Sequence, residues 1–331
     1  MTFSGAAVIS LLDPLSQTPV DSWVGLGLLL IALTIGLVLT IFFTYKLVRY
    51  PAQFTADLFN PGQGAQTAAW PASLLIAALA TSQAGVSGIL PAVTALIVGI
   101  IVGSLGLIGT VITGFSFFNH VITHPNIPAQ AISAGWFVPV VPLVLVPSIT
   151  FRLSALSGSV APEWAVWLAV SAWGIGFGLF MLLASIVGGR LLMHEPPQAH
   201  ALPTWWAWLA PLGAGGLGLV ASSRLVGDET ITSAAYFVAA AIWGFAAWWS
   251  IFAIVIIFQM RKEAHFHLGY WGFGFPTASM AALSLEIGRH FNFGWLVVVG
   301  DVYWILLMTM LVVFSVLTVS LWRTGKLFPA K

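Results

Sequence analysis

The sequence contains no cysteine, which excludes disulfide bonds, thiolate-bound metals and cysteine nucleophiles. It is also poor in charge: Asp, Glu, Lys and Arg make up 6% of its 331 residues, against about 25% in soluble domains. The formal net charge is only +1, so the composition indicates no nucleic-acid partner. With so few charged side chains the chain cannot cover the surface of a soluble domain, and a soluble globular protein is excluded.

Motifs of catalysis and cofactor binding are missing as well: the sequence has no HExxH, GxSxG or Walker pattern. A b-type haem needs axial ligands inside a helical bundle, but the seven histidines all lie at or beyond the ends of apolar runs: His120, His124, His194, His200, His265, His267 and His290. His120/His124 and His265/His267 are either metal ligands by spacing or solvated interfacial side chains. We expect no metal, cofactor or catalytic residue, which argues against a membrane enzyme or redox subunit.

What the sequence has instead is long apolar runs: 59% of its residues are hydrophobic and the mean hydropathy is +1.00. Runs of more than about 18 apolar residues are typical of helices that span a bilayer. Polar residues separate ten segments: 3–13, 23–48, 70–84, 91–118, 132–151, 164–192, 203–226, 231–259, 268–289 and 295–322. The first is too short to span about 30 Å, so the start is truncated or misassigned, or the helix is completed by other means. The short connections predict a single integral membrane transport domain over 1–331.

Basic residues predict the orientation of the chain. Most of them follow even-numbered segments or lie at the C-terminus: Lys46, Arg49, Arg190, Arg261, Lys262, Arg323, Lys326 and Lys331. The others, Arg152, Arg224 and Arg289, close segments five, seven and nine on the opposite side. Loops rich in Lys and Arg remain cytoplasmic, so both termini are predicted to be cytoplasmic in a multi-pass protein of the cell (inner) membrane.

Prolines are distributed unevenly among the segments. From the third onward, the odd-numbered segments contain Pro71; Pro139, Pro142 and Pro147; Pro211; and Pro276. The even-numbered ones contain only Pro91, at a helix start where proline is tolerated. Proline kinks a helix and frees a carbonyl, which at membrane depth must be buried in protein or face water. The pattern favours an all-α fold of five helical hairpins, with kinked odd helices inside and regular even helices facing lipid. The alternative is a chance distribution.

Ionisable side chains within the segments are few. Asp301, about two turns into the tenth segment, is either a proton site of a coupled transporter or an acid satisfied at the interface near Arg289. If the odd helices surround one axis, Arg152, Arg224 and Arg289 form a funnel at its external mouth. A ring of basic side chains favours anions. The alternative is that each arginine stabilises a helix C-terminus and anchors it at the interface.

Residues 269–281, GYWGFGFPTASMA, combine glycine and proline, the two weakest helix formers, in an apolar segment. Pro276 cannot donate the hydrogen bond that would reach the carbonyl of Gly272, and glycine at that position leaves room for a bend. Gly274 removes a side chain beside Phe275. The stretch therefore predicts a bend next to Phe275, whose alternative role is that of a packed core aromatic.

Several groups of residues resemble one transporter family. They are Tyr50-Pro51 with Ala56-Asp57-Leu58 and Asn60-Pro61; His124-Pro125 with Trp136-Phe137-Val138-Pro139; and Trp271-Gly272-Phe273-Gly274-Phe275 with Ala278-Ser279-Met280-Ala281. In order and spacing they resemble the tellurite-resistance/dicarboxylate transporter family, which includes bacterial TehA and the plant guard-cell slow anion channels. Phe-Ser-Gly at 3–5 resembles the pore segment of the family's first helix.

The resemblance implies ten helices, arranged as five hairpins in quasi-fivefold order around a central pore, and a homotrimer with one pore per protomer. It implies that Phe275 plugs the pore and that Gly5 lines it, beside the expected kink residues Pro71, Pro142, Pro211, Gly272, Gly274 and Pro276. The expected function is passive conduction of small inorganic or organic anions across a lipid bilayer. The alternative is a facilitated or proton-coupled carrier or exporter of C4-dicarboxylate, sulfite or tellurite-type oxyanions.

Overall fold

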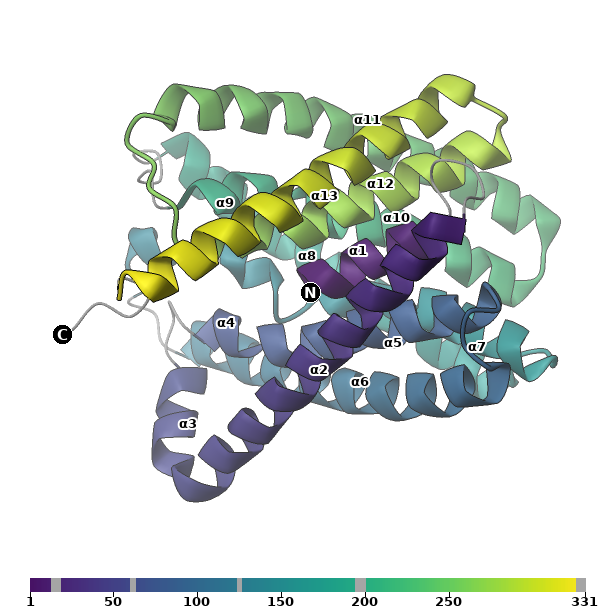
Figure 1. Cartoon of the computed structure of the whole chain (residues 1–331), viewed down its shortest axis with the longest axis horizontal. Helices are drawn as coiled ribbons and strands as arrows, with labels where there is room; N and C mark the ends of the chain where they lie inside the picture. Colours follow the sequence, from purple (N-terminus) through teal and green to yellow (C-terminus); the bar gives the residue numbers. More distant parts are fainter. Residues whose placement is uncertain (13–18, 60–63, 124–126, 194–200, 326–331) are drawn as a thin grey trace.

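The structure, a computed structural model, describes residues 1–12, 19–59, 64–123, 127–193 and 201–325 (Figure 1). All regular secondary structure in these residues is helical. Seven of the described spans are long and apolar enough to cross a membrane. The chain is therefore a polytopic all-α membrane protein, as the apolar runs predict.

Five long helices expose most of their surface. They are α2 (Pro19–Arg49), α6 (Ala92–Thr123), α8 (Glu163–Met193), α11 (Glu229–Met260) and α13 (Gly294–Arg323). In their most apolar stretches only 11% to 28% of the residues are buried within the protein. The exposed side chains are mainly Leu, Ile, Val, Phe and Trp, which are stable in hydrocarbon and costly in water. These helices form the lipid-facing layer.

Five shorter helices make up the interior. They are α1 (Thr2–Leu11), α5 (Ala69–Val86), α7 (Val146–Ser157), α10 (Leu209–Val226) and α12 (Gly274–His290). The spans that contain α5 and α10 are 78% and 72% buried. In that order each short helix packs against the next, and α12 packs against α1, so the contacts form a closed ring. Each short helix also packs against the long helix that follows it in the chain. In Figure 1 the N-terminus lies near the middle of the molecule, at the start of α1.

The prolines of the interior begin helices rather than bend them. Pro71, Pro211 and Pro276 are each the third residue of α5, α10 and α12, and Pro147 is the second residue of α7. The first turn of a helix has backbone N–H groups without intrahelical partners, so proline is tolerated there. A separate short helical piece precedes each: α4 (Gly64–Thr67), η3 (Val141–Leu145), α9 (Leu202–Trp206) and η5 (Leu268–Phe273). The inner spans are therefore broken before the proline, which differs from the expected kink within one continuous helix.

The expected segment boundaries agree with the helices to within a few residues, with one exception. The fifth segment, expected over 132–151, contains 3-10 turns at η2 (Ala134–Phe137) and η3 before α7, and it ends at Ser157. Three closely spaced prolines prevent a regular α-helix at its start. Two further pieces, α3 (Pro51–Leu58) and η1 (Ala129–Ala131), lie in connections.

Glycine lets the interior helices pack backbone to backbone. A Cβ atom on Gly213 of α10 would lie 2.7 Å from the backbone carbonyl carbon of Ser279 in α12. One on Gly218 would lie 2.2 Å from the carbonyl oxygen of Val144 in η3. Neither contact tolerates a side chain, because backbone atoms cannot rotate away. Small residues at such positions are how membrane helices approach closely.

Candidate functional site

Phe275 is the second residue of α12 and follows directly after the break between η5 and α12. Its side chain is partly buried, and α1 passes beside it. A Cβ atom on Gly5 would lie 3.7 Å from the ring Cδ2 atom of Phe275 and 2.9 Å from the Cβ atom of Ala278. The structure thus brings together Gly5 and Phe275, which are 270 residues apart in the sequence.

Phe273 provides a contrast two residues earlier. It is 6% exposed, and its ring centroid lies 5.6 Å from that of Tyr270, 6.2 Å from that of Trp206 and 6.4 Å from that of Phe314. Within the described part of the chain the ring of Phe275 makes no contact of this kind with another aromatic ring. Phe273 is therefore the packed core aromatic of this stretch, and Phe275 packs against the backbone of α1 instead.

The break before α12 is filled by the first helix. The Thr2 hydroxyl of α1 donates a hydrogen bond of 2.8 Å to the carbonyl of Trp271. A Cβ atom on Gly274 would lie 2.0 Å from the Thr2 Cγ2 atom. The space that Gly274 leaves is thus occupied by Thr2 rather than left open beside the Phe275 ring. Gly272 is exposed, and a Cβ atom there would meet only Pro203, at 3.7 Å.

The remaining residues expected along the inner helices lie at corresponding positions. Pro71, Pro142, Pro211 and Pro276 are all buried, each within the first turn of its helical piece. They mark the level at which the inner spans break. Phe275 lies at this same level, because it directly precedes Pro276.

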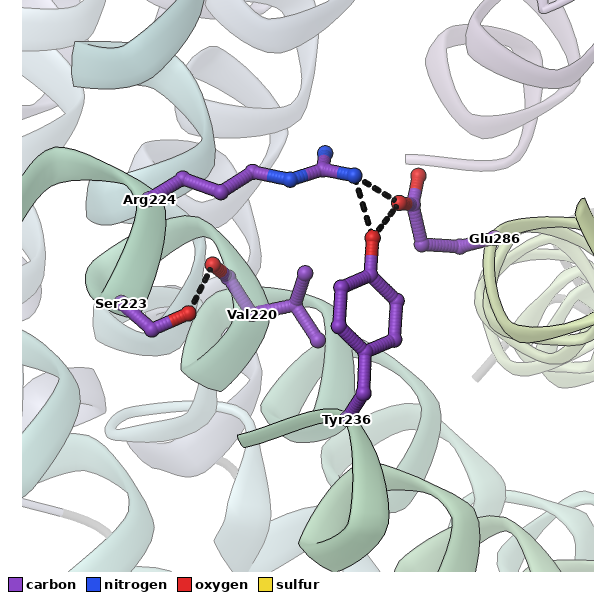
Figure 2. Close-up of polar contacts among 5 residues, drawn as sticks. All are labelled: Val220, Ser223, Arg224, Tyr236 and Glu286. Carbon is purple, nitrogen blue, oxygen red and sulfur yellow. Dashed lines mark hydrogen bonds and ion pairs between the residues drawn. The ribbon is translucent and has the colours of Figure 1, made fainter. Parts of the chain in front are cut away.

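A polar cluster joins three helices at the other end of α12, as Figure 2 shows. Glu286 of α12 accepts hydrogen bonds of 2.6 Å at Oε1 from Arg224 Nη2 of α10 and from the Tyr236 hydroxyl of α11. Arg224 Nη2 also donates to the Tyr236 oxygen. The Tyr236 ring stacks on His290, with centroids 3.4 Å apart and planes 3° from parallel. The carboxylate of Glu286 thus compensates the charge of Arg224.

Arg152 of α7 is held differently. Its Nε donates a 2.6 Å hydrogen bond to the side-chain oxygen of Gln83 in α5, and its Nη1 donates to the Ser148 carbonyl at 3.0 Å. The Gln83 amide in turn donates to Ser87 and to the carbonyl of Leu11, where α1 ends. In the described residues Arg152 forms no ion pair. Glu286 and Arg224 are the charges that act on it from a distance.

Arg289 is the most exposed of the three predicted funnel arginines, and its Nη1 donates a 3.0 Å hydrogen bond to the carbonyl of Leu12. Asp301 lies on α13, and its Oδ1 atom is buried without a hydrogen-bond partner among the described residues. Arg289 is the charge that acts on Asp301 electrostatically. The three arginines occupy the same end of the molecule, near the C-terminal ends of α7, α10 and α12 (Figure 1).

Other expected features lie partly outside the described residues, namely Asn60-Pro61, His124-Pro125, His194, His200, Lys326 and Lys331. No group of three or more His, Asp or Glu side chains that could hold a metal ion occurs among the residues that the structure describes. Lys46 and Asp57, which the family-like loop after α2 contains, form an ion pair between α2 and α3.

Four residues of these sites carry no role in the sequence analysis: Thr2, Gln83, Tyr236 and Glu286. One signal was available for Glu286, because it follows Phe275 by 11 residues, or about three turns of 3.6. The two side chains therefore lie on one face of α12. No comparable signal exists for the others, since their partners are distant in the sequence.

Comparisons with known proteins give the chain its place. Against an uncharacterized transporter of Methanocaldococcus jannaschii it is 28% identical, covering 61% of the chain and 59% of the relative. Against a sulfite efflux pump of Trichophyton rubrum it is 27% identical, covering 60% of the chain and 56% of the relative. Against a malic acid transport protein of Schizosaccharomyces pombe it is 25% identical, covering 59% of the chain and 49% of the relative. The matched region thus spans about half to three-fifths of these relatives.

The fold and the nature of the relatives define a class: multi-pass membrane transport proteins for small anions. The family model described as voltage-dependent anion channel matches residues 1–319. The chain belongs to this family, which confirms the resemblance to the tellurite-resistance/dicarboxylate transporters. The family and the reported relatives are transporters or channels rather than enzymes.

Proposed function

We propose that this protein is a passive anion channel of the cell (inner) membrane, with a pore at the centre of each protomer and Phe275 as its gate. The chain is one transport domain of ten helices in five hairpins, its termini face the cytoplasm, and three copies assemble. The observation that carries the gate is the position of Phe275, which lies against Gly5 at the level where the inner spans break.

The ring of inner helices supports a central path. The helices α1, α5, α7, α10 and α12 contact one another in a closed circle. Between their first turns and their C-terminal ends they contain no acidic or basic residue except near one mouth. A path along their axis is therefore apolar, and small anions cross it without an intermediate charged site. Such a path needs an obstruction to stay closed.

A phenyl ring can provide this obstruction in two ways. It fills the cross-section sterically, and its apolar surface disfavours a continuous water column, which is a gating mode of channels. Phe275 has the backbone of α1 on one side and no aromatic partner in the described residues. A rotamer change is therefore less costly for Phe275 than for Phe273, which three other rings enclose.

The test is anion conductance of Phe275→Ala beside wild type in lipid bilayers, with chloride, nitrate and malate. We expect conductance to rise by at least about tenfold, which corresponds to removing a barrier of about 1.4 kcal/mol. Phe273→Ala is the matched control, because it removes the same side chain two residues away, and its conductance is expected to stay near that of wild type. Folded Phe275→Ala protein that conducts no better than wild type contradicts the gate.

A carrier or exporter is the second candidate function. It is supported by the similarity to a sulfite efflux pump and a malic acid transport protein, and by the buried, unpartnered Oδ1 atom of Asp301, since intramembrane acids often serve coupled transport. A carrier would give saturable flux with little macroscopic current. If protons drive it through Asp301, Asp301→Asn would abolish the pH dependence of that flux.

A further inference from the structure

The external mouth contains a charge arrangement that a simple ring of arginines does not have. Arg224 is paired with Glu286, whereas Arg152 is bound by the neutral amide of Gln83. Glu286 and Arg224 both act on Arg152 electrostatically, with opposite signs. These three side chains together carry one net positive charge, because the carboxylate cancels one of the two guanidinium groups.

Glu286 is also aligned with the gate. It follows Phe275 by 11 residues on α12, so the two side chains share a face and lie about 16 Å apart along the helix. Ala278 and Ala282 lie between them on that face, and Ala278 borders Gly5 of α1. No large side chain of this face of α12 separates the carboxylate from the ring. An anion on its way to Phe275 therefore approaches Glu286 first.

We propose that Glu286 determines the discrimination between monovalent and divalent anions at this mouth. The inference rests on the proposed function, because it concerns the same anion path. A dianion interacts twice as strongly as a monoanion with any local net charge. The carboxylate of Glu286 keeps that charge low and so limits the advantage of dianions. Without it the mouth gains one positive charge, and dianions gain more than monoanions.

A purely structural role is the competing explanation, since Glu286 also connects α10, α11 and α12. The substitution Glu286→Gln separates the two roles. Its amide oxygen can still accept hydrogen bonds from Arg224 and Tyr236, while the negative charge is lost. Arg224→Gln changes the charge in the opposite direction, and the double variant Arg224→Gln/Glu286→Gln has the same net charge as wild type.

The experiment measures the malate-to-chloride permeability ratio by reversal potential, at a pH at which malate is a dianion. Each variant is measured alone and with Phe275→Ala, so that a closed gate does not hide the effect. We expect Glu286→Gln to raise the ratio about fourfold, for one charge about 10 Å from the path in a partly aqueous medium. Arg224→Gln lowers it, and the double variant returns it toward the wild-type value. Glu229→Gln is the matched control, because Glu229 is an exposed acid in the first turn of α11, outside the cluster.

The outcomes separate this inference from the proposed function. If Phe275→Ala conducts anions but Glu286→Gln leaves the ratio unchanged, the selectivity role is wrong and the gate stands. Equal changes in Glu286→Gln and Glu229→Gln also overturn it, because they indicate a general surface-charge effect. If no variant carries anions, including Phe275→Ala, both the proposed function and this inference fail.

Discussion

The inner and outer helices of this protein solve the same problem, burial in a bilayer, in opposite ways. The outer helices are continuous, 30 to 32 residues long, and expose large apolar side chains. The inner spans are short or broken, and they pack through glycine, alanine and serine. An outer helix needs only hydrocarbon around it, so its sequence is tolerant. An inner helix needs specific neighbours, because its freed carbonyls must find donors within the protein.

Added volume should distinguish the two layers most strongly. Gly218 of α10 and Gly244 of α11 both lie within helices, but a Cβ atom on Gly218 would lie 2.2 Å from a backbone oxygen and one on Gly244 meets nothing within 4 Å. We expect Gly218→Leu to cost about 5 kcal/mol or more, at the exceptional end for one substitution, and to prevent recovery of folded protein. Gly244→Leu should purify like wild type. Size-exclusion chromatography in detergent makes the comparison, and equal yields would show that the interior is not packed as described.

Removal of an aromatic ring should give the next largest effect. Phe273→Ala leaves a cavity among Trp206, Tyr270 and Phe314, so we expect a loss of about 3 to 5 kcal/mol of stability. Phe275→Ala should cost less than half as much, because its ring is partly buried and lacks aromatic neighbours. Thermal denaturation of the two variants measures the difference. A larger loss for Phe275→Ala would identify Phe275 as a core residue rather than a gate.

A smaller effect is expected from a charge near each end of the path. Arg152→Gln removes the inner arginine that lacks a carboxylate partner in the described residues, while an amide can still donate to Gln83. We expect anion conductance at low salt to fall about threefold and the difference to shrink at high salt, since salt screens the attraction. Arg190→Gln, on the outer helix α8 at the opposite end, is the control and should change little. A salt-independent loss would indicate damaged packing instead.

The smallest effect is expected at the periphery. Lys46 and Asp57 pair between α2 and α3, but their side chains are 41% and 39% exposed. Such surface pairs contribute about 0 to 1 kcal/mol, so Asp57→Asn should leave the melting temperature almost unchanged. A shift comparable to that of Phe273→Ala would mean that the outer layer depends on specific contacts as the interior does.

Much of the fold could be read from the sequence, because hydrophobicity and proline are local properties. The apolar runs predict every long helix to within a few residues, and the odd-numbered prolines indicate which spans lie inside. The form of those spans was different from expectation. Pro71, Pro211 and Pro276 start new helices after a break, and a break needs donors such as the Thr2 hydroxyl, which reaches Trp271 from the other end of the chain.

The candidate site could be predicted only in outline. The sequence indicated Phe275 and the three arginines, but treated the arginines as equivalent. In the structure Arg224 is paired, Arg152 is bound by an amide and Arg289 is exposed at the surface. These differences depend on Gln83, Tyr236 and Glu286, whose positions relative to the arginines are set by how separate helices pack.

By itself, the sequence determined that this chain is embedded in a membrane, where its helices run and which residues carry charge. Composition and periodicity decide these properties, because a bilayer acts on each segment separately. Only the tertiary structure decided which residues meet: Gly5 with Phe275, Thr2 with Gly274, and Arg224 with Glu286. The physical reason is that helix packing depends on the fit of surfaces distant in the chain, and no local pattern encodes that fit.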